Sequence, residues 1–404
     1  MIKFLVIEQD LRVSGTSQGI ISRSFLAKLR MTYPNAIIDV LYLKHHESED
    51  CLDLLPIDSI VTHVLNLKIP FFTKWYNKLY WRLFHVSLNE DYVHKVYASY
   101  IAKVSYEEYD HIFIRSAGLN CEMLLAAKNL PILKKSIITF NEPYPMFWCS
   151  GAKLKLDNLD LFRLKNMNEV VGQSKSCMAT SFLAKDMQYL YGSQKIFYEI
   201  PHQFDETVFD LNDKSQVFQK SKKVAISYHG ALQFGRNIEV LLDCYSELIN
   251  SNKTYKENTE FFMRLKSSEL NRLKEKYFNE ENIIFLEGVN FSNSMYEQKH
   301  LSDIDILLEN GPIYCSILLG KAPLVASFNK PILVLSPHRS EIKAIIKDEA
   351  FVANYDNKEE IKTKLENLII NRLNDELYIN PFGDYFSDEN FKLMLDKIIK
   401  GKDD

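Results

Sequence analysis

Two basic residues, Arg236 and Lys321, each lie in a loop between an apolar run and the start of a helical pattern. In a parallel α/β sheet, such loops lie at the carboxyl ends of the strands, where ligands bind. A guanidinium or ammonium group beside the free backbone N–H groups of a helix start suits an anion. The two residues therefore predict a phosphate or diphosphate site, with Gly230, Ser316 and Gly320 in the same two loops.

Glu142 is the main candidate for acid–base chemistry. It follows an apolar run over residues 137–140 and belongs to the motif Asn-Glu-Pro-Tyr-Pro at 141–145. A carboxyl group held in a partly apolar pocket keeps its proton to higher pH, which suits a general base. The two prolines equally fit a surface loop in which the carboxylate is solvated. The sequence is compatible with both interpretations of Glu142.

A glycine-containing loop follows the first apolar run of the chain. Gly15, Thr16 and Gly19 lie in it, between the run at residues 3–8 and a helical pattern at residues 20–33. The spacing does not match the dinucleotide fingerprint GxGxxG, which argues against binding of NAD. No GxxxxGK[ST] phosphate loop occurs in the chain, which argues against binding of ATP. A tight turn explains the glycines as well as ligand binding does.

The alternation of strands and helices continues along the chain. Further strands are expected at residues 37–43, 111–115, 137–140 and 170–174, with a helix at 178–191. The apolar density falls over residues 201–222, and the pattern restarts at residue 224. A length of 404 residues with 46% hydrophobic content is enough for two cores.

We therefore predict an α/β protein with two Rossmann-like, doubly wound domains facing a cleft. The predicted parts are an N-terminal domain at 1–200, a linker at 201–222, a second domain at 223–385, and a C-terminal helix and tail at 386–404. A return of this helix to the N-terminal domain is one option.

The composition argues against several classes of function. A net charge of −4 gives no electrostatic reason to expect a nucleic-acid partner. The six cysteines show no CxxC or Cys/His spacing that would suit a metal ion. The carboxylates of Asp303 and Asp305 fall at the start of a buried strand and not in a loop, so they are not expected to bind a metal ion either. The chain opens on a strand-like run in place of a signal peptide and has no apolar run of ~20 residues, which predicts a cytoplasmic protein.

An aromatic and basic stretch at residues 68–84 allows two interpretations. Lys74, Lys78 and Arg82 recur every four residues, so on a helix they fall along one side, with aromatic residues around them. Such a helix suits a lipid headgroup layer, which would place the protein at the inner face of the membrane. It also suits a helix packed on the sheet with its lysines in water, which is the interpretation we favour from the sequence.

Taken in order, five motifs resemble those of the GT-B glycosyltransferases, specifically the large group-1 superfamily of bacterial sugar transferases. The resemblance spans nearly the whole chain. It implies a C-terminal domain that binds a nucleotide-diphosphate sugar and an N-terminal domain that holds the acceptor. The motifs lie at residues 15–19, 141–145, 200–205, 230–236, and 316–321 with 329–333.

The resemblance also implies roles for single residues. Arg236 and Lys321 would neutralise the donor diphosphate, assisted by Ser316. Independently of the resemblance, we expect Glu142 to act as general base if the reaction inverts. Neither a metal nor a cofactor is implied, because protein cations can stabilise the leaving diphosphate.

The chain departs from the family's pattern at three positions. Ser316 and Leu324 stand where many members carry two glutamates, and Ala231 stands where the first phosphate-binding arginine is expected. A leucine cannot accept a hydrogen bond from a ribose hydroxyl. Other groups are then expected to hold the nucleoside or sugar: Gly288, Val289 and Glu309.

The sequence thus predicts transfer of a sugar from a nucleotide-diphosphate sugar to a hydroxyl of a bacterial surface glycan or lipid-linked acceptor. Two other functions fit the same architecture. One is a sugar-nucleotide epimerase. The other is a non-catalytic binding subunit of a glycan-assembly complex, which the missing acidic pair would suit.

Overall fold

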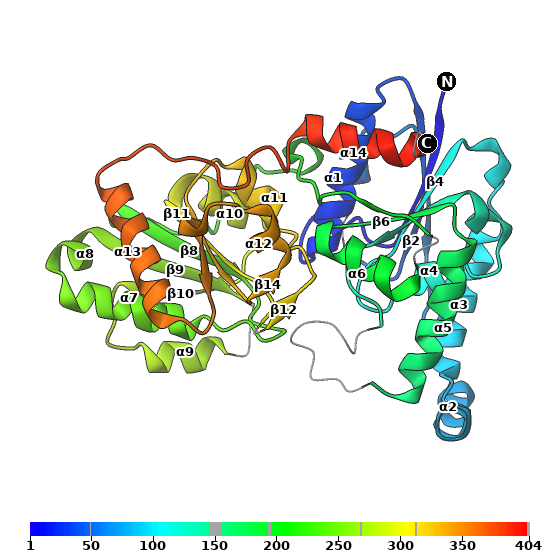
Figure 1. Ribbon diagram of the computed structural model, residues 1–404, viewed down its shortest axis with the longest axis horizontal. Helices are drawn as coiled ribbons and strands as arrows, with labels where there is room; N and C mark the ends of the chain where they lie inside the picture. The colour runs from blue at the N-terminus through cyan, green and yellow to red at the C-terminus, as the bar shows by residue number, and fades with distance from the viewer. Residues whose placement is uncertain (49, 146–155, 193–194, 267–268, 312, 402–404) are drawn as a thin grey trace. The chain divides into compact units, whose positions relative to one another are not determined.

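The computed structural model describes residues 1–48, 50–145, 156–192, 195–266, 269–311 and 313–401. The chain divides into two compact units, one of Met1–Val208 with Ser387–Asp404 and one of Phe209–Phe386. Each unit contains a parallel β-sheet with helices packed against it (Figure 1). The α/β class predicted from the alternation of strands and helices is therefore confirmed.

The first unit is built on a seven-stranded parallel sheet in the order β3-β2-β1-β4-β5-β6-β7. Its central strands are buried on both faces, and every residue of β5 is buried. Such strands read as continuous apolar runs because neither face meets water. The strands span Lys3–Glu8 (β1), Ile37–Lys44 (β2), Ser59–Val64 (β3), His111–Arg115 (β4), Ser136–Phe140 (β5), Ser176–Ala179 (β6) and Phe197–Glu199 (β7).

Polar caps fix where the longer helices of the first unit begin. The Thr16 side chain accepts a hydrogen bond from the Gly19 N–H (3.2 Å) at the start of α1, and Asp157 and Asp160 form a capping box at the start of α5. These caps satisfy N–H groups that have no partner within the helix. The helices span Ser17–Thr32 (α1), Phe71–Phe84 (α2), Leu88–Ile101 (α3), Glu122–Ala126 (α4), Asn158–Gln173 (α5), Ser181–Tyr191 (α6) and Asp388–Lys400 (α14), with short 3₁₀ turns at Leu52–Leu54 (η1), Tyr106–Glu108 (η2), Pro131–Lys135 (η3) and Glu206–Val208 (η5).

The second unit has a six-stranded parallel sheet in the order β10-β9-β8-β11-β13-β15 and a separate two-stranded pair, β12 with β14. All five residues of β11 and of β13 are buried. The strands span Val224–Gly230 (β8), Thr259–Leu265 (β9), Ile283–Glu287 (β10), Ile304–Leu308 (β11), Tyr314–Cys315 (β12), Ile332–Ser336 (β13), Arg339–Ser340 (β14) and Val352–Asn354 (β15).

The helices of the second unit are mostly short, and one of them changes its hydrogen-bond pattern before it ends. A π-helical turn, η6, directly continues α10. Such turns are frequent at functional sites. The helical segments span Glu239–Ser251 (α7), Lys253–Asn258 (α8), Leu270–Lys276 (α9), Phe291–Tyr296 (α10), Glu297–Leu301 (η6), Ala322–Ser327 (α11), Glu341–Ile345 (α12), Glu349–Phe351 (η7) and Lys358–Leu373 (α13).

Both sheets share one topology. In each, the first strand of the unit is central, the second and third add to one side, and the fourth and later strands add to the other side. The direction of winding therefore switches between β1 and β4 in the first unit and between β8 and β11 in the second. In open α/β sheets, ligands bind outside the carboxyl ends of the strands at this switch point.

Two sequence-based expectations for local structure differ from the fold. Residues 170–174 were expected to form a strand, but α5 continues to Gln173 and the strand β6 begins at Ser176. Val170 and Val171 form part of the buried face of that helix. A short apolar run cannot distinguish a strand from one helical turn. The edge strand β3, which is largely exposed, was not predicted.

The stretch predicted as a linker, residues 201–222, divides between the two units after Val208. His202 and Gln203 are buried, and the Val208 carbonyl accepts hydrogen bonds from the fully buried guanidinium of Arg23 (2.9 and 2.6 Å). This buried cation needs backbone carbonyls as partners. It thereby holds the part of the segment that ends at Val208 in the first unit.

The C-terminal helix α14 packs on the first unit. Phe391 is buried and contacts Phe25 edge-on, with ring centroids 6.1 Å apart. Asp388 pairs with Lys28 at 2.8 Å, and Asp396 accepts a hydrogen bond from Tyr33 at 2.6 Å. The last helix of the chain therefore completes the core that the first helix, α1, begins.

Truncating Phe391 tests this packing. We expect Phe391→Ala to lower the free energy of unfolding by about 3–5 kcal/mol, because it leaves a cavity beside Phe25. Urea unfolding followed by circular dichroism measures the loss. Leu393→Ala, on the exposed side of the same helix, should cost under about 0.5 kcal/mol. Equal losses in the two variants would show that α14 is not docked as described.

Candidate functional site

Lys321 directly precedes α11, and its side chain reaches the carboxyl end of β8. Its Nζ atom is 4.8 Å from the centre of the Tyr228 ring. Gly230 has a φ of +147°, and a Cβ atom at this residue would lie 2.5 Å from the Lys321 Nζ. Glycine at 230 therefore leaves room for the lysine side chain, and the structure brings these two predicted site residues together.

Arg236 lies in the loop after β8 and reaches across to the loop after β11. Its Nε donates to Asn310 Oδ1 (3.0 Å) and its Nη1 to the carbonyl oxygen of Ala231 (3.3 Å). The two loops also touch where a Cβ atom on Gly235 would lie 2.8 Å from the carbonyl oxygen of Gly311. Arg236 thus spans the switch point of the second unit.

The two cations affect each other. Desolvation and the nearby charge of Arg236 lower the pKa of Lys321 to about 7, against a smaller opposing effect of Asp305. Within the described residues, neither cation forms an ion pair with a carboxylate, because the partners of Arg236 are neutral and Lys321 lies over a tyrosine ring. Two neighbouring positive charges without a counter-ion favour an anionic ligand.

Glu309 follows β11 directly and is fully buried. Burial raises its pKa to about 7, although Arg236 is close enough to act in the opposite direction. One carboxyl oxygen accepts a hydrogen bond from the Ile342 N–H (3.2 Å), and the other has no hydrogen-bond partner in the described part of the chain. Ser316 is also buried, with a hydroxyl that lacks a partner there. Gly320 directly precedes Lys321, so these residues lie on the β11 side of the switch point.

The other two residues predicted to contact the nucleoside or sugar, Gly288 and Val289, lie elsewhere on the same sheet edge. They follow β10, which is three strands from β11 and therefore about 14 Å from it. The Gly288 backbone packs closely on Lys266, since an added Cβ would lie 2.7 Å from that side chain. The structure thus does not bring Gly288 beside Glu309.

Between these positions lies a polar cluster that sequence reasoning missed. His229, which is 4% exposed, contacts Ser294 Oγ through Nδ1 (2.9 Å), while its Nε2 has no hydrogen-bond partner in the described residues. The buried Glu297 lies 3.8 Å from that Nε2 and is held by Arg264 at 2.6 and 3.0 Å. Burial, Lys321 and Arg264 hold the pKa of His229 well below its usual value. Its place directly before Gly230 was the available signal.

Glu142 follows β5 in the first unit. Burial raises its pKa to about 7, and its Oε2 has no hydrogen-bond partner in the described part of the chain. The neighbouring Asn141 donates to Gln18 Oε1 (3.1 Å) and to the carbonyl oxygen of Ser116 (3.3 Å). One oxygen of the Glu142 carboxyl is therefore enclosed, while the residue as a whole is partly exposed. Such a group can accept a proton near neutral pH.

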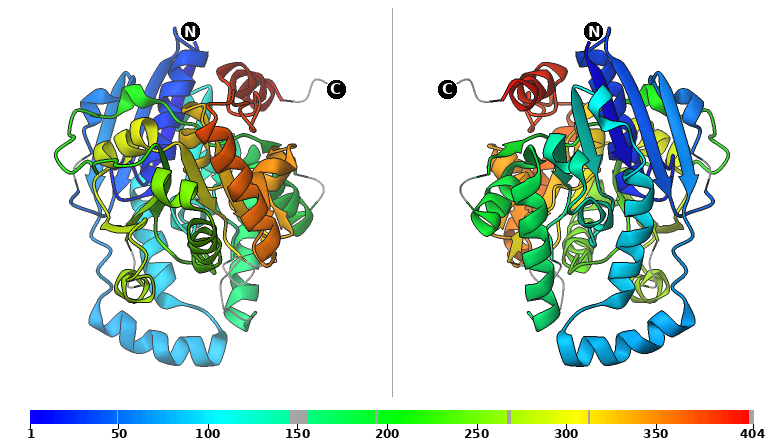
Figure 2. Two further views of the ribbon diagram at one scale, coloured as in Figure 1. Left: turned by 90° about the vertical axis from the view of Figure 1, so that its left-hand side faces the viewer. Right: turned by 90° about the vertical axis from the view of Figure 1, so that its right-hand side faces the viewer.

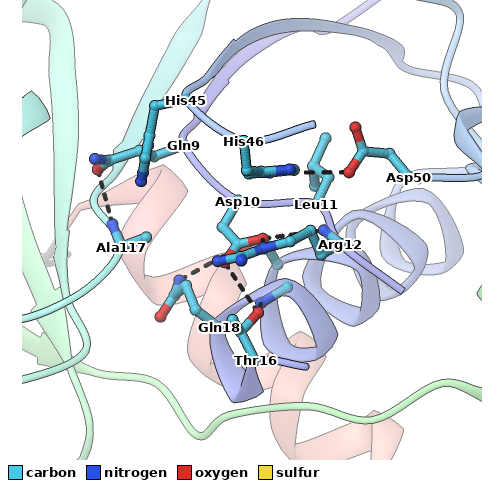
Figure 3. A network of polar contacts seen from close by, with 12 residues as sticks. Gln9, Asp10, Leu11, Arg12, Thr16, Gln18, His45, His46, Asp50 and Ala117 are labelled. Atoms are coloured by element: carbon cyan, nitrogen blue, oxygen red, sulfur yellow. Dashed lines mark hydrogen bonds and ion pairs between the residues drawn. The ribbon is translucent and has the colours of Figure 1, made fainter. Parts of the chain in front are cut away.

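The loop that contains Gly15, Thr16 and Gly19 is organised by Asp10 (Figure 3). The Asp10 carboxylate accepts hydrogen bonds from Arg12 Nε (3.0 Å), Arg12 Nη2 (2.6 Å) and Thr16 Oγ1 (2.9 Å). At Gly19, a Cβ atom would collide with the Arg12 carbonyl oxygen. Thr16 and Gly19 are thus required by the loop itself.

Gln9 joins the two strands at the switch point of the first unit. Its Oε1 accepts a hydrogen bond from the Ala117 N–H (3.1 Å), which is the dashed line between these two residues in Figure 3. Its amide group donates to Glu122 and to Tyr97, both at 2.8 Å. His45 and His46 follow β2; Figure 3 shows His45 next to Gln9 and His46 facing Asp50, with His46 Nε2 3.9 Å from Asp50 Oδ1. Sequence reasoning missed these side chains because no motif marks them.

The first unit also contains two adjoining pockets of about 560 and 450 Å³, a size typical of ligand sites. Helices α3 and α5 supply much of their walls. Both pockets are lined by Tyr144, from the 141–145 motif, and by Glu90, His94 and Arg163. Burial lowers the pKa of His94, which favours its neutral form.

Several solved structures resemble this chain. Sucrose-phosphate synthase from Thermosynechococcus elongatus superposes with a TM-score of 0.62 at 10% identity, over 99% of this chain and 98% of that chain. A putative UDP-N-acetylglucosamine 2-epimerase from Listeria monocytogenes gives 0.56 at 14% identity, over 100% and 97%. UDP-GlcNAc 2-epimerase from Neisseria meningitidis, bound to UDP-GlcNAc, gives 0.56 at 14% identity, over 99% and 100%. No family model and no curated sequence matches the chain.

The chain has the GT-B fold. This confirms the architecture that the five motifs predicted. Identities of 10–14% carry no residue roles, so the site in this GT-B chain depends on its own geometry.

Asp303 and Asp305 hold β11 against β8 in this GT-B fold. Asp303 accepts a hydrogen bond from the Ala225 N–H (2.7 Å), and Asp305 accepts one from Ser227 Oγ (2.9 Å). Within the described ranges, no group of three or more His, Cys, Asp or Glu side chains is arranged to hold a metal ion. The two aspartates therefore have a structural explanation.

The lowered pKa of Lys321 predicts a pH-dependent stability. From pH 7 to the usual lysine value of 10.5, the unfolded chain binds more protons than the folded one, so Lys321 costs less stability as the pH rises. Lys321→Met should thus stabilise the protein most near pH 7 and progressively less toward pH 10.5. Urea unfolding across this range measures the gain. The exposed Lys274→Met is the control, and a gain independent of pH would contradict the assignment.

Proposed function

We propose that the protein transfers a sugar from a nucleotide-diphosphate sugar to a hydroxyl group of a surface glycan or a lipid-linked acceptor. The observation that carries this proposal is the pair Arg236 and Lys321 at the switch point of the second unit. Both are cationic groups, and neither has a carboxylate partner among the described residues. A diphosphate supplies the missing negative charge.

The similar structures support this choice of ligand. One is an epimerase bound to UDP-GlcNAc, another is a trehalose-6-phosphate enzyme of E. coli bound with UDP-2-fluoro glucose, and a third is a complex of S. aureus MnaA with UDP. Each binds a uridine nucleotide on the same fold. We extend this ligand class to the present chain, without assigning the base or the sugar.

In the proposed reaction, the bond between the anomeric carbon and the diphosphate oxygen breaks, and negative charge grows on the leaving diphosphate. Arg236 stabilises that charge permanently, since guanidinium stays protonated. Lys321 is partly neutral near pH 7 and gains a proton as the anion approaches, so its positive charge is strongest when the diphosphate is bound. Preorganised cations of this kind need no metal ion.

Glu142 is our candidate for the base that takes the proton from the acceptor hydroxyl in an inverting reaction. Its enclosed carboxyl has a pKa of about 7, so the deprotonated form is a stronger base than an ordinary glutamate. The pockets lined by Tyr144 lie in the same unit and offer room for an acceptor.

Removing the cations tests the diphosphate assignment. Arg236→Ala and Lys321→Ala should each lower kcat/KM for the nucleotide sugar by about 10²–10³-fold, because each removes a positive group that faces the leaving anion. Turnover of donor, followed by release of nucleoside diphosphate, measures the effect. Arg272→Ala, on the exposed side of α9, is the control. Rates near wild type in both site variants would exclude a role for Arg236 and Lys321 in binding the diphosphate.

Replacing the proposed base tests the second role. Glu142→Gln should reduce kcat by about 10²–10⁴-fold while donor binding is retained. In the wild type, kcat/KM should fall as the pH drops below about 7, because Glu142 becomes protonated there. This limb of the pH profile should be absent from the residual activity of the variant. A limb that persists in Glu142→Gln would assign it to another group.

A sugar-nucleotide epimerase is the second candidate, and one buried side chain favours it. His229 has a ring nitrogen without a hydrogen-bond partner in the described residues, beside Glu297 and near Lys321. A neutral histidine in that position could exchange a proton with a bound sugar. Formation of an epimer without any acceptor would identify this activity. Binding without turnover under either assay would favour the non-catalytic subunit.

A further inference from the structure

Helix α2 exposes an unusual number of large apolar side chains. Nine of its fourteen residues belong to this class, and none of the fourteen is buried. Exposed apolar side chains normally occur singly, whereas a contiguous group marks an interaction surface. The exposed fractions range from 42% for Tyr80 to 75% for Phe71, and the others are Phe72, Trp75, Tyr76, Leu79, Trp81, Leu83 and Phe84.

The helix does not pack on the sheet. Its helical neighbour is α3, and both views of Figure 2 place α2 at the periphery of the first unit, away from the strands. The sequence-based preference for a helix packed on the sheet is therefore wrong. Amphipathic spacing shows that a helix has an apolar face, but not whether another element of the protein covers it.

The polar residues of α2 divide its surface. Lys74, Lys78 and Arg82 recur every four residues and fall along one side. At the helical angle of about 100° per residue, Trp75 and Leu79 lead from this basic side onto the main apolar face. Long basic side chains can keep their charges in water while their stems lie along an apolar surface. Tryptophan and tyrosine, two residue types that favour the membrane interface, account for four of the nine exposed side chains.

The charge of α2 has one sign. The segment contains no Asp or Glu, and its three basic side chains form no ion pair within the described residues. Pairing of two copies through this helix would therefore bring like charges together, which is unfavourable. An anionic lipid surface complements both the charges and the aromatic side chains.

We propose that α2 lies in the headgroup layer of an anionic membrane, with its aromatic face toward the acyl chains and its basic side chains at the lipid phosphates. No helix in the described ranges is long and apolar enough to span a bilayer. The attachment is thus peripheral. It is independent of the proposed reaction, since it needs no nucleotide sugar.

The flanks of α2 connect it to the pockets of the first unit. Ile69, just before the helix, lines the smaller pocket, and Val86, just after it, lines the larger one. A molecule in these pockets would therefore lie next to the membrane surface that we propose for α2. This arrangement suits an acceptor that is itself held in the membrane.

Co-sedimentation with vesicles tests the proposal on the full chain without nucleotide sugar. We expect binding to vesicles of phosphatidylcholine and phosphatidylglycerol at a ratio of about 7:3, and weaker binding to phosphatidylcholine alone. Trp75 and Trp81 are two of the three tryptophans of the chain, so their fluorescence should shift to shorter wavelength on binding. Absence of binding, or binding without this shift, would overturn the proposal.

Two sets of substitutions separate the contributions of charge and apolar surface. Lys74→Gln, Lys78→Gln and Arg82→Gln together should reduce the partition onto anionic vesicles on the order of 100-fold. A second variant, with Trp75→Ser, Leu79→Ser and Leu83→Ser, should weaken binding to both vesicle types. Thermal unfolding should change little in either variant, because these side chains are exposed.

A matched control removes the same charge elsewhere on the first unit. Lys103→Gln, Lys134→Gln and Lys165→Gln together neutralise three exposed lysines outside α2 and should leave vesicle binding within about twofold. An equal loss in this control would show diffuse charge attraction, which contradicts a role for α2. Dimerisation that disappears in the serine variant, without vesicle binding by the wild type, would assign the helix to a second copy of the chain.

Discussion

Two positive charges at the carboxyl ends of β8 and β11 are the constraint on which this account depends. Arg236 and Lys321 are close enough for one to lower the pKa of the other, and no carboxylate within the described residues pairs with either. Gly230 leaves space for the lysine, and the contact of Gly235 with Gly311 joins the loop that carries the arginine to the loop after β11. The second unit thus maintains an arrangement that is unfavourable until an anion binds.

The first unit contains ionisable side chains at its own switch point, and most of them are paired. At its switch point, Glu8 and Arg115 form a buried ion pair at 2.7 Å, and the amide side chain of Gln9 bridges neighbouring loops by accepting from the Ala117 N–H and donating to the Glu122 carboxylate. Glu142 stands apart from this satisfied network because one of its oxygens has no partner in the described residues. A carboxyl group that has an enclosed oxygen without a hydrogen-bond partner and a raised pKa is a candidate for proton transfer.

Much of the fold could be predicted because buried parallel strands have a simple signature. The continuous apolar runs at 3–8 and 111–115 correspond to β1 and β4. Exposed or short segments gave no such signal, so β3 was missed and the end of α5 was mistaken for a strand. The surroundings of α2 could not be predicted, since they depend on elements distant in the sequence.

The candidate site was predictable only in part, for the same reason. Loop position after a strand was enough to single out Arg236, Lys321 and Gly230, which the structure brings together at one switch point. Position along the chain gave no information on lateral distance across the sheet, so Gly288 was grouped with Glu309 although β9 and β8 lie between the strands that they follow. The pairing of His229 with Ser294 and Glu297 joins segments more than sixty residues apart in the chain, and no local pattern reveals it.

Proton uptake on donor binding tests the central claim most directly. Above pH 7 the free Lys321 is mostly neutral, and a bound diphosphate would raise its pKa. Calorimetric titration with a nucleotide-diphosphate sugar at about pH 8, in buffers of different ionisation enthalpy, should show uptake approaching about one proton per site. This uptake should be absent in Lys321→Met. Binding without proton uptake, or with the same uptake in that variant, would contradict the account.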